Sequence, residues 1–564
     1  MKRLVMKLVL STLVAGMSLP LAAQAADDDL QMKIDKLTKE VQDLKGSVQR
    51  VEGKSLGKWL TIGGDYRFRV DSLYGETVGY TSAPAFMGAL QRDPNTMGFF
   101  ATPAAQGMLS STAYGAVAGL TPQAMMGNFV NYMANTPGNP FFGDPAGAGA
   151  YLQGLGGGAF VQAFKPKNQT LYTNKFGLDL GIKATQDVTV HAKLDMYKAF
   201  GSQTDATTMN GYFADRVGVF DGTLSHVPSD SLLNVDRAYA TWSNIADQPL
   251  WFSVGRRPST NGAPSNLRLN NERPGNGGTP ALLVDYAFDG MTIGYAPDID
   301  MLPGAYAKVC YGRGFDSGLK TPTNSIKDTD MLGVAVLPID TDPLRVWLQW
   351  NRGFDIFDFP EMNNTIFGNT RPTVNLGSID WYGAGAMSTL KDIGPGKLNF
   401  FTDFGLSVTH PSDNVSAAAG FQGLMTGGFL APEAPKEKTG WAVYAGVRYD
   451  LPSKTKIGFE FNHGSKNWIT FAPAADDMWT SKVGVRGNVY EPYVIQELNL
   501  KPISSYFAKA FFKIGYQYYD FEYTGSNNWV GAPQKISSIQ PSDLMLMTPV
   551  KSAHDIYGTF EVKF

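Results

Sequence analysis

Apolar and polar side chains alternate with a period of two between Trp59 and Val70. The apolar set takes the even positions and the polar set the odd ones: Leu60, Ile62, Tyr66, Phe68 and Val70 against Thr61, Asp65, Arg67 and Arg69. A β-strand places two such sets on opposite faces. In a soluble β-sandwich the polar face would point outward, whereas in an outer-membrane barrel it points into the lumen.

The alternation recurs in fifteen later segments, so we predict an all-β chain of sixteen antiparallel strands. These segments span residues 172–183, 188–197, 233–243, 250–257, 281–296, 305–313, 330–337, 344–352, 379–388, 397–408, 441–450, 456–463, 489–499, 506–523 and 554–564. Seven short turns then fall on one side and eight long loops on the other. This asymmetry is typical of transmembrane outer-membrane β-barrels.

The segment 281–296 decides the strand count. Asp289-Gly290 interrupts its alternation, and Asp-Gly is a strong hairpin signal. Two strands here would give an odd total and would move the later short turns to the side of the long loops. We therefore predict one strand with a β-bulge at Asp289-Gly290. The alternative is a barrel of 18 strands, with a further strand inside a long loop.

Residues 1–25 read as a secretory signal peptide. Lys2, Arg3 and Lys7 precede an apolar run, and Ala23-Gln24-Ala25 forms a cleavage site. No later apolar run approaches the length of a membrane helix, so an exported chain that enters a membrane does so with strands. The last strand ends on the aromatic Phe564 and resembles the signal read by the outer-membrane assembly machinery. The expected location is therefore the cell outer membrane.

Residues 26–54 predict a short coiled-coil helix in the periplasm, ahead of the barrel at 59–564. Its apolar seam has heptad spacing: Leu30, Ile34, Leu37, Val41, Leu44, Val48 and Val51. The seam implies a homo-oligomer. Its residue types favour two chains, but diffusion porins are usually threefold, so a trimer is the preferred expectation. The alternative is a single amphipathic helix that lies on the barrel rim or in its mouth.

Composition supports a membrane location and argues against several functions. Charged residues make up 18% of the chain, below the usual quarter of soluble domains. Without the signal peptide the net charge is near −6, and nothing suggests nucleic acid. The five histidines are scattered, Cys310 is the single cysteine, and no metalloprotease, serine-hydrolase or phosphate-binding motif occurs. We predict neither an enzyme nor a bound metal or cofactor.

Sixteen strands leave an aqueous channel, so the polar phase predicts the residues that line a pore. By phase these are Asp65, Arg67, Arg69, Lys175, Asp179, Lys183, Lys193, Asp195, Lys308, Arg345, Asp380, Asp403, Arg448, Glu460, Lys509, Lys513 and Glu561. Ten are basic and seven are acidic, which favours a weak anion preference. The alternative for any one of them is a solvated charge that pairs across strands.

A long insert, residues 71–169, follows the first strand. Its central part carries four charged residues, and Thr102-Pro103 and Thr121-Pro122 read as helix starts. A structureless loop of this length is improbable, so we expect the insert to pack inside or over the barrel and to narrow the channel. The alternative is an external cap or a contact with neighbouring subunits.

Three arginines form a basic cluster in the loop after the fifth predicted strand. Arg256, Arg257 and Arg268 surround a Gly/Pro-rich stretch. Such a cluster can bind an anionic solute or a lipopolysaccharide phosphate. The preferred interpretation is that the arginines brace the loop against barrel carboxylates.

Several blocks of the chain resemble a family of uncharacterised Gram-negative outer-membrane porins. They are the first strand LTIGGDYRFR after a signal and a heptad helix, the loop VGRRPSTNGAPSNLR at 254–268, and the block GSKNWITFAPAADDMWTSKVGVRGNVYE at 464–491. The resemblance runs from end to end. It implies a barrel in contact with outer-membrane lipid and lipopolysaccharide, and it permits a role as a sheath around a multihaem cytochrome.

Three functional hypotheses follow. The first is a channel for passive diffusion of small hydrophilic solutes, weakly anion-selective and narrowed by the insert at 71–169. The second is a barrel scaffold that insulates a cytochrome in an electron conduit. The third is a structural protein that tethers the envelope through its coiled coil.

Overall fold

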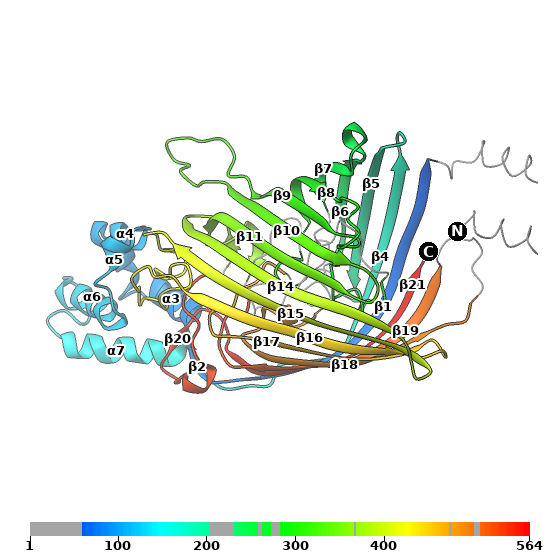
Figure 1. Ribbon diagram of the computed structural model, residues 1–564. Helices are drawn as coiled ribbons and strands as arrows, with labels where there is room; N and C mark the ends of the chain where they lie inside the picture. The colour runs from blue at the N-terminus through cyan, green and yellow to red at the C-terminus, as the bar shows by residue number, and fades with distance from the viewer. Residues whose placement is uncertain are drawn as a thin grey trace, which may run out of the picture. The chain divides into compact units, whose positions relative to one another are not determined.

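The computed structural model describes residues 59–201, 230–257, 262–271, 282–285, 287–365, 368–472, 477–500 and 508–564. The predicted signal peptide and the heptad seam lie outside these residues and stay predictions. Residues 62–564 form one compact unit. A closed barrel of sixteen strands is the main element of this unit (Figure 1).

The barrel strands follow one another in chain order, and neighbours pair antiparallel. They are β1 Leu60–Thr77, β4 Lys167–Lys183, β5 Val188–Ala199, β6 Asp230–Trp242, β7 Leu250–Arg257, β8 Phe288–Tyr295, β9 Tyr306–Phe315, β10 Thr329–Asp340, β11 Arg345–Phe357, β14 Asn375–Ile393, β15 Gly396–Pro411, β16 Thr439–Asp450, β17 Thr455–Gly464, β18 Gly487–Glu497, β19 Lys509–Phe521 and β21 Val550–Lys563. The first strand pairs with the last, with Arg67 opposite Glu561. The predicted count of sixteen is confirmed, and the alternative of 18 is wrong.

Strand β8 starts later than the sequence predicts. It begins at Phe288, and Leu282, Leu283 and Val284 before it form a buried turn rather than part of the wall. Strands β7 and β8 pair without a register shift, with Arg256 opposite Asp289. The predicted bulge at Asp289-Gly290 is therefore wrong. The count stays even because the first half of this apolar segment leaves the sheet.

The two faces of the wall differ as the alternation predicts. In β1, Arg67 and Arg69 are buried on the inner face, while Tyr66 and Phe68 on the outer face are half-buried. The outward positions of the other strands expose large apolar side chains, among them Val254, Ile293, Val309, Leu348, Phe404, Ile457, Phe512 and Ile514. An apolar outer band of this kind is the surface that lipid covers in a membrane barrel.

The insert after β1 folds into helices between two short strands. The helices are α3 Ala83–Arg92, α4 Pro103–Leu109, α5 Tyr114–Val117, α6 Pro122–Asn135 and α7 Pro145–Gly158, with a 3-10 turn at Met97–Ala101. Strands β2 Tyr80–Ser82 and β3 Phe160–Val161 join β20 Leu544–Met545 in a small sheet, and β12 Met362–Thr365 pairs with β13 Gly368–Thr370. Thr102 and Thr121 each cap a helix that opens with proline, so both predicted helix starts are confirmed. Among the described helices, none combines the length and the apolar character needed to cross a membrane.

Candidate functional site

The insert packs on the loop between β15 and β16, beyond the ends of the strands. The Tyr114 amide donates to the Asp413 carbonyl at 2.8 Å, and the Val415 amide donates to the Thr112 carbonyl at 2.8 Å. Phe129 of α6 belongs to an apolar core that this loop completes. Figure 1 shows the helices at the end of the barrel opposite the C-terminus. The insert therefore lies beyond one end of the strands, and its effect on a channel stays a prediction.

Loops other than the insert fill the lumen beside β10 to β18. We call the described parts of three of them, residues 262–271, 282–285, 466–472, 477–486 and 524–531, the plug. Within it Leu282, Leu283, Trp468 and Ile469 have no exposed surface. They share one apolar cluster with inward-facing wall residues, including Trp347, Trp381, Phe401 and Tyr444. This half of the inner wall is thus covered by a packed apolar core.

Backbone groups of the plug are satisfied inside that core. The indole Nε1 of Trp381 in β14 donates to the Ile469 carbonyl at 2.9 Å, and that of Trp468 donates to the Val483 carbonyl at 2.7 Å. The Phe471 amide donates to the Leu283 carbonyl at 3.0 Å and joins two of the plug loops. Because buried peptide groups without partners are costly, these bonds allow irregular loops to stay inside the barrel.

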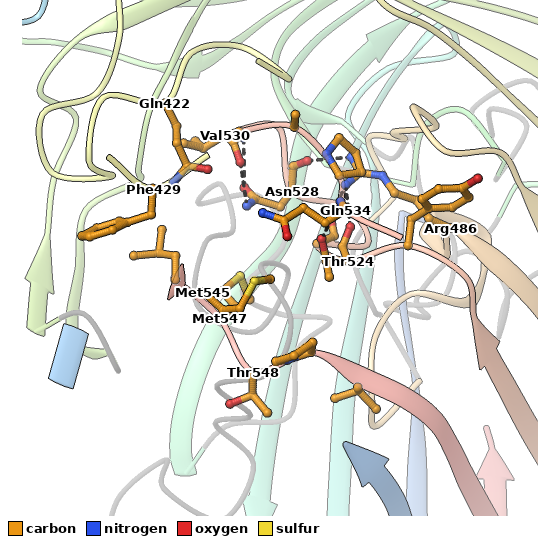
Figure 2. Close-up of a pocket in the computed structure, with 18 of the residues that line it drawn as sticks. Gln422, Phe429, Arg486, Thr524, Asn528, Val530, Gln534, Met545, Met547 and Thr548 are labelled. Atoms are coloured by element: carbon orange, nitrogen blue, oxygen red, sulfur yellow. Dashed lines mark hydrogen bonds between the residues drawn. The ribbon is translucent and has the colours of Figure 1, made fainter. Parts of the chain in front are cut away.

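Arg486 joins the plug loops at the mouth. Its guanidinium donates to the carbonyls of Trp468, Thr524, Gly525 and Asn528 at 2.7–3.0 Å. Burial lowers the pKa of Arg486 to about 9, so the group stays charged at neutral pH. Figure 2 shows Arg486 beside a pocket that is also lined by Gln422, Phe429 and Met545. This pocket has a volume of about 60 Å³, room for a few water molecules only.

Lys482 attaches the plug to the barrel wall by charge. Its ammonium lies 2.6 Å from Glu491 Oε2 of β18 and also contacts Glu460 of β17. All three side chains are at most 2% exposed. The Tyr557 hydroxyl donates to Glu491 Oε1 at 2.6 Å, and Tyr444 donates to Glu460. We call Lys482, Glu460 and Glu491 the latch.

A second ion pair lies within the plug beside the latch. Arg268 Nη1 is 3.0 Å from Asp477 Oδ1 and 3.6 Å from Glu491 Oε2. Asp477 also accepts the Lys482 amide at 2.9 Å and the Gln517 side-chain amide at 2.7 Å. Burial by itself would raise the pKa of Asp477, but Arg268 and Lys482 outweigh burial and hold that pKa below its ordinary value of 3.8.

Two cations predicted to line a pore instead bind the backbone of the plug. Arg448 of β16 donates to the Leu267 carbonyl at 2.6 Å, and Lys513 of β19 donates to the Arg268 carbonyl at 3.3 Å. Lys563 of β21 adds a bond to the Leu269 carbonyl at 2.8 Å. Their inward orientation agrees with the prediction. Arg448 also pairs with Asp450, two positions further along the same strand, at 2.7 Å, but the contacts with the plug could not be read from strand phase.

The opposite wall, β1 and β4 to β6, carries paired charges. Lys193 Nζ is 2.7 Å from Asp65 and 3.6 Å from Asp195, which also lies 3.0 Å from Lys175. Arg67 donates to the Tyr197 hydroxyl at 3.0 Å. Arg69, also on β1, lies between Asp71 and Asp555. On β4, Asp179 is opposite Lys193, and Lys183 is exposed at the end of the strand.

The remaining predicted residues divide between the two faces. Two of them bind aromatic side chains: Arg345 donates to the Tyr306 hydroxyl, and Asp403 accepts a hydrogen bond from the Trp347 indole. Glu561 accepts a hydrogen bond from the Thr559 hydroxyl. Lys509 stands opposite Lys563 in the strand pairing, and Lys308 is buried in β9. Asp380 points outward, where it lies 3.0 Å from Arg352 and 2.8 Å from His410. The predicted inward orientation of Asp380 is wrong, because Ile379 and Trp381 take the inner positions of β14.

The three loop arginines do not form one cluster. Arg256 pairs with Asp289 at 2.6 Å on the outer face. Arg257 points inward and donates to the Ser253 hydroxyl at 2.7 Å, and Arg268 lies in the plug. The three separate because Arg256 and Arg257 are strand neighbours of opposite parity, while residues 262–271 lie in the lumen. Bracing of the loop against a barrel carboxylate, the preferred interpretation, is seen for Arg268, which lies 3.6 Å from Glu491 of β18, whereas Asp289, the partner of Arg256, lies on the neighbouring strand β8.

Sequence reasoning did not assign Lys482, Asp477, Trp468 or Arg486 to a site. All four lie in the block 464–491, which was noticed for its resemblance alone. A signal was present: a long loop with two tryptophans and several charges is unusual for a solvated connection. Among the described residues, no three His, Cys, Asp or Glu side chains are placed to hold a metal ion.

The closed sixteen-stranded barrel, its apolar outer band and its charged inner face define an outer-membrane β-barrel. The chain belongs to a family described as a protein of unknown function (DUF3373), whose model matches residues 165–564. No curated protein matches the chain in sequence.

Three solved structures are similar to the chain at low identity. OmpF of Salmonella typhi, in complex with daunomycin, aligns with a TM-score of 0.37 at 8% identity and covers 89% of this chain and 97% of its own. An anion-selective porin from Comamonas acidovorans aligns with a TM-score of 0.36 at 9% identity, covering 90% and 99%. A loop-deletion mutant of OmpT from Vibrio cholerae gives 0.35 at 10% identity, covering 90% and 99%. The function proposed below therefore rests on residues of this chain.

Proposed function

We propose that the protein is an outer-membrane channel for small hydrophilic solutes whose lumen is held shut by the plug. The wall supports this proposal, because sixteen strands enclose more space than side chains alone can fill. Part of the inner wall carries charges that suit water and ions, among them Lys175, Lys193 and Asp195. The plug packs on the inner wall from β10 to β18 and would have to move for solutes to pass.

The observation that carries the proposal is the charged attachment of the plug at the latch. Replacing a buried ion pair by well-packed apolar residues is often neutral or stabilising. A permanent filling would therefore be held at least as well by hydrocarbon as by Lys482, Glu460 and Glu491. Buried charges are best attested where a structure needs a switch or a specific register. An ionic latch thus favours a plug that can leave its position against the barrel wall.

The cytochrome sheath has less support. A multihaem protein inside the barrel would need the space that Trp468, Ile469 and Leu283 occupy beside β14 and β15. The tether rests on the heptad seam, which lies outside the described residues. The sheath predicts haem absorbance in the gently purified protein. The tether predicts weaker envelope attachment in cells whose protein lacks residues 32–51.

The test is conductance in planar bilayers with the full chain purified in detergent. Replacing residues 466–483 by a short Gly/Ser linker keeps β17 and β18 joined and removes the latch lysine. This variant is expected to give steps several times larger than the wild type. The matched control shortens the exposed loop 316–328 between β9 and β10, and its conductance should equal that of the wild type. If neither the wild type nor the shortened plug conducts, the chain is not a channel.

A further inference from the structure

Residues 267–271 of the plug are held by one inward side chain from each of five adjacent strands, β16 to β19 and β21. These side chains are Arg448, Lys456, Glu497, Lys513 and Lys563. Four of the five are cations, and each of the four donates a hydrogen bond to an oxygen atom of the plug segment. The charged part of the wall therefore binds this segment through its oxygen atoms.

Four successive backbone carbonyls, those of residues 267–270, accept hydrogen bonds from wall cations. Arg448 donates to the first at 2.6 Å, and Lys513 donates to the second at 3.3 Å. Lys563 donates to the third at 2.8 Å and to the fourth at 3.3 Å. A carbonyl oxygen is an acceptor that every peptide and many small solutes also carry. The wall thus recognises a chemical group that is not particular to this segment.

Two of the four cations also have a carboxylate on the wall. Arg448 pairs with Asp450 at 2.7 Å, and Lys456 pairs with Glu497 at 2.7 Å. Both ion pairs lie within the barrel strands, so neither depends on the plug. Arg448 and Lys456 would therefore keep a partner of opposite charge if the plug segment left the wall.

Lys513 and Lys563 differ from those two cations. In the part of the chain that the structure describes, neither ammonium forms an ion pair, and all their hydrogen bonds go to residues 268–271. Lys513 is 3% exposed, and one of its three donors is used. Glu561 attracts both ammonium groups from farther away, and the two ammonium groups repel each other. If the segment leaves, both lysines lose all their hydrogen-bond acceptors.

The latch and this lysine pair hold the plug in opposite ways. The latch sets an ammonium against two carboxylates, whereas Lys513 and Lys563 meet neutral oxygens of a segment that reads Arg-Leu-Asn-Asn at 268–271. A carboxylate would add the attraction of opposite charges, which is strong where water is excluded. Its two oxygens can also accept from both ammonium groups at once. A solute that carries a carboxylate is therefore a better partner for the two lysines than the plug segment is.

We propose that Lys513 and Lys563 form a carboxylate site on the lumen wall, which the carbonyls of residues 268–270 fill while the plug is in place. This inference rests on the proposed channel function and names its substrate class, small organic acids. The solute and the plug segment use the same ammonium groups, so the solute binds the open state alone. Its binding shifts the population toward that state.

The first experiment measures binding to the detergent-purified full chain through its thermal unfolding midpoint, with succinate as the probe at constant ionic strength. Deleting residues 264–271 removes the competing carbonyls, and β7 and β8 stay joined by the rest of their loop. This deletion variant should bind succinate about tenfold more tightly than the wild type. Adding Lys513→Gln and Lys563→Gln should weaken binding about tenfold. Adding Lys454→Gln instead is the matched control, because Lys454 is exposed in the turn between β16 and β17, and binding should not change.

The second experiment follows the open probability of the wild type in planar bilayers. Succinate should raise it severalfold, and the uncharged four-carbon solute erythritol should leave it unchanged. Lys513→Gln by itself removes a single hydrogen bond of 3.3 Å from the plug segment, so the plug should stay in place while the response to succinate falls severalfold. This point variant decides the question by itself if the deletion variant does not fold.

The outcomes separate the site from the channel. Equal succinate binding by the deletion variant with and without the two lysines would overturn the site, and so would an undiminished response of Lys513→Gln. Stabilisation by inorganic phosphate as strong as that by succinate would overturn the assignment to carboxylates. Succinate binding without a change in open probability would overturn the competition with the plug. Absence of conduction in every protein would overturn the channel, and the succinate titration then decides the site by itself.

Discussion

Two sectors of one barrel wall show what strand alternation determines and what it leaves open. The wall of β1 and β4 to β6 turns paired charges inward, such as Lys193 with Asp65 and Asp195. The wall of β14 to β18 turns Trp381, Phe401 and Tyr444 inward against the plug. Both sectors belong to the same closed sheet and both present apolar side chains to the outside.

The difference lies in what each inner face meets. A charged face suits water and ions, whereas an aromatic face needs hydrocarbon to cover it. Where aromatic and charged groups occur together, as at Glu460 and Tyr444, the loop that covers them must supply both apolar contact and counter-charge. The plug does so with Trp468 and Lys482. The composition of the inner face thus reflects the loop that folds onto it.

The largest difference in open probability is expected between variants of Lys482, in the latch, and of Lys193, in the charged wall. Lys482→Met leaves Glu460 and Glu491 buried without an ammonium, and breaking a buried ion pair from one side costs about 3–5 kcal/mol. The docking equilibrium of the plug should fall by about a hundredfold or more, seen as a sharp rise in open probability in bilayers. Lys193→Met should change the open probability little, because Asp195 keeps its other partner, Lys175, at 3.0 Å.

Two further variants make the lysine comparison decisive. Lys466→Met removes an exposed lysine from the same plug loop and should behave as the wild type. Adding Glu460→Gln and Glu491→Gln to Lys482→Met removes the stranded charges and should recover most of the closed state. If Lys482→Met opens no more often than Lys193→Met, the latch does not hold the plug.

The barrel could be predicted from the sequence because its determinants are local. The opposite environments of Tyr66 and Arg67 follow from the period of two. The alternation of short turns with long loops sets the strand count, and Thr102 and Thr121 begin helices through a cap that needs a few neighbouring residues.

The plug could not be predicted because no local pattern tells an inward loop from an outward one. Leu282, Leu283 and Val284 satisfy a strand pattern, yet they are buried in the lumen. Arg448 has the predicted inward phase, but besides Asp450 it binds the carbonyl of Leu267, 181 positions earlier in the chain. Contacts of this kind depend on which loops enter the barrel. Which loops enter depends in turn on the side chains of the whole inner wall, which lie far apart in the sequence.

Acid should loosen the plug by an intermediate amount. Asp477 has a pKa held below 3.8 by Arg268 and Lys482, so its stabilisation is complete above the unfolded pKa and is lost as the pH falls through the folded one. Hydrogen bonds to charged groups contribute about 1.5–3 kcal/mol. Open probability should stay level from pH 7 to about 5 and rise below about pH 4. Asp477→Asn should be more open at pH 7 and respond less to acid; an undiminished response would assign the acid effect to other carboxylates.

The smallest effect on conductance is expected from removing the helical insert. The Ser82 amide donates to the Ala159 carbonyl at 2.9 Å, so residues 83–158 can be replaced by a short Gly linker without moving β2 or β3. Sequence reasoning predicts a rise in conductance, because the insert was expected to narrow the channel. With the plug in the lumen, the rise should be small beside that of the variant lacking residues 466–483. Phe129→Ala, which should cost the insert core about 3–5 kcal/mol, serves as a milder version that keeps the chain length. A larger conductance step from the insert deletion than from the shortened plug would place the constriction at the mouth rather than in the lumen.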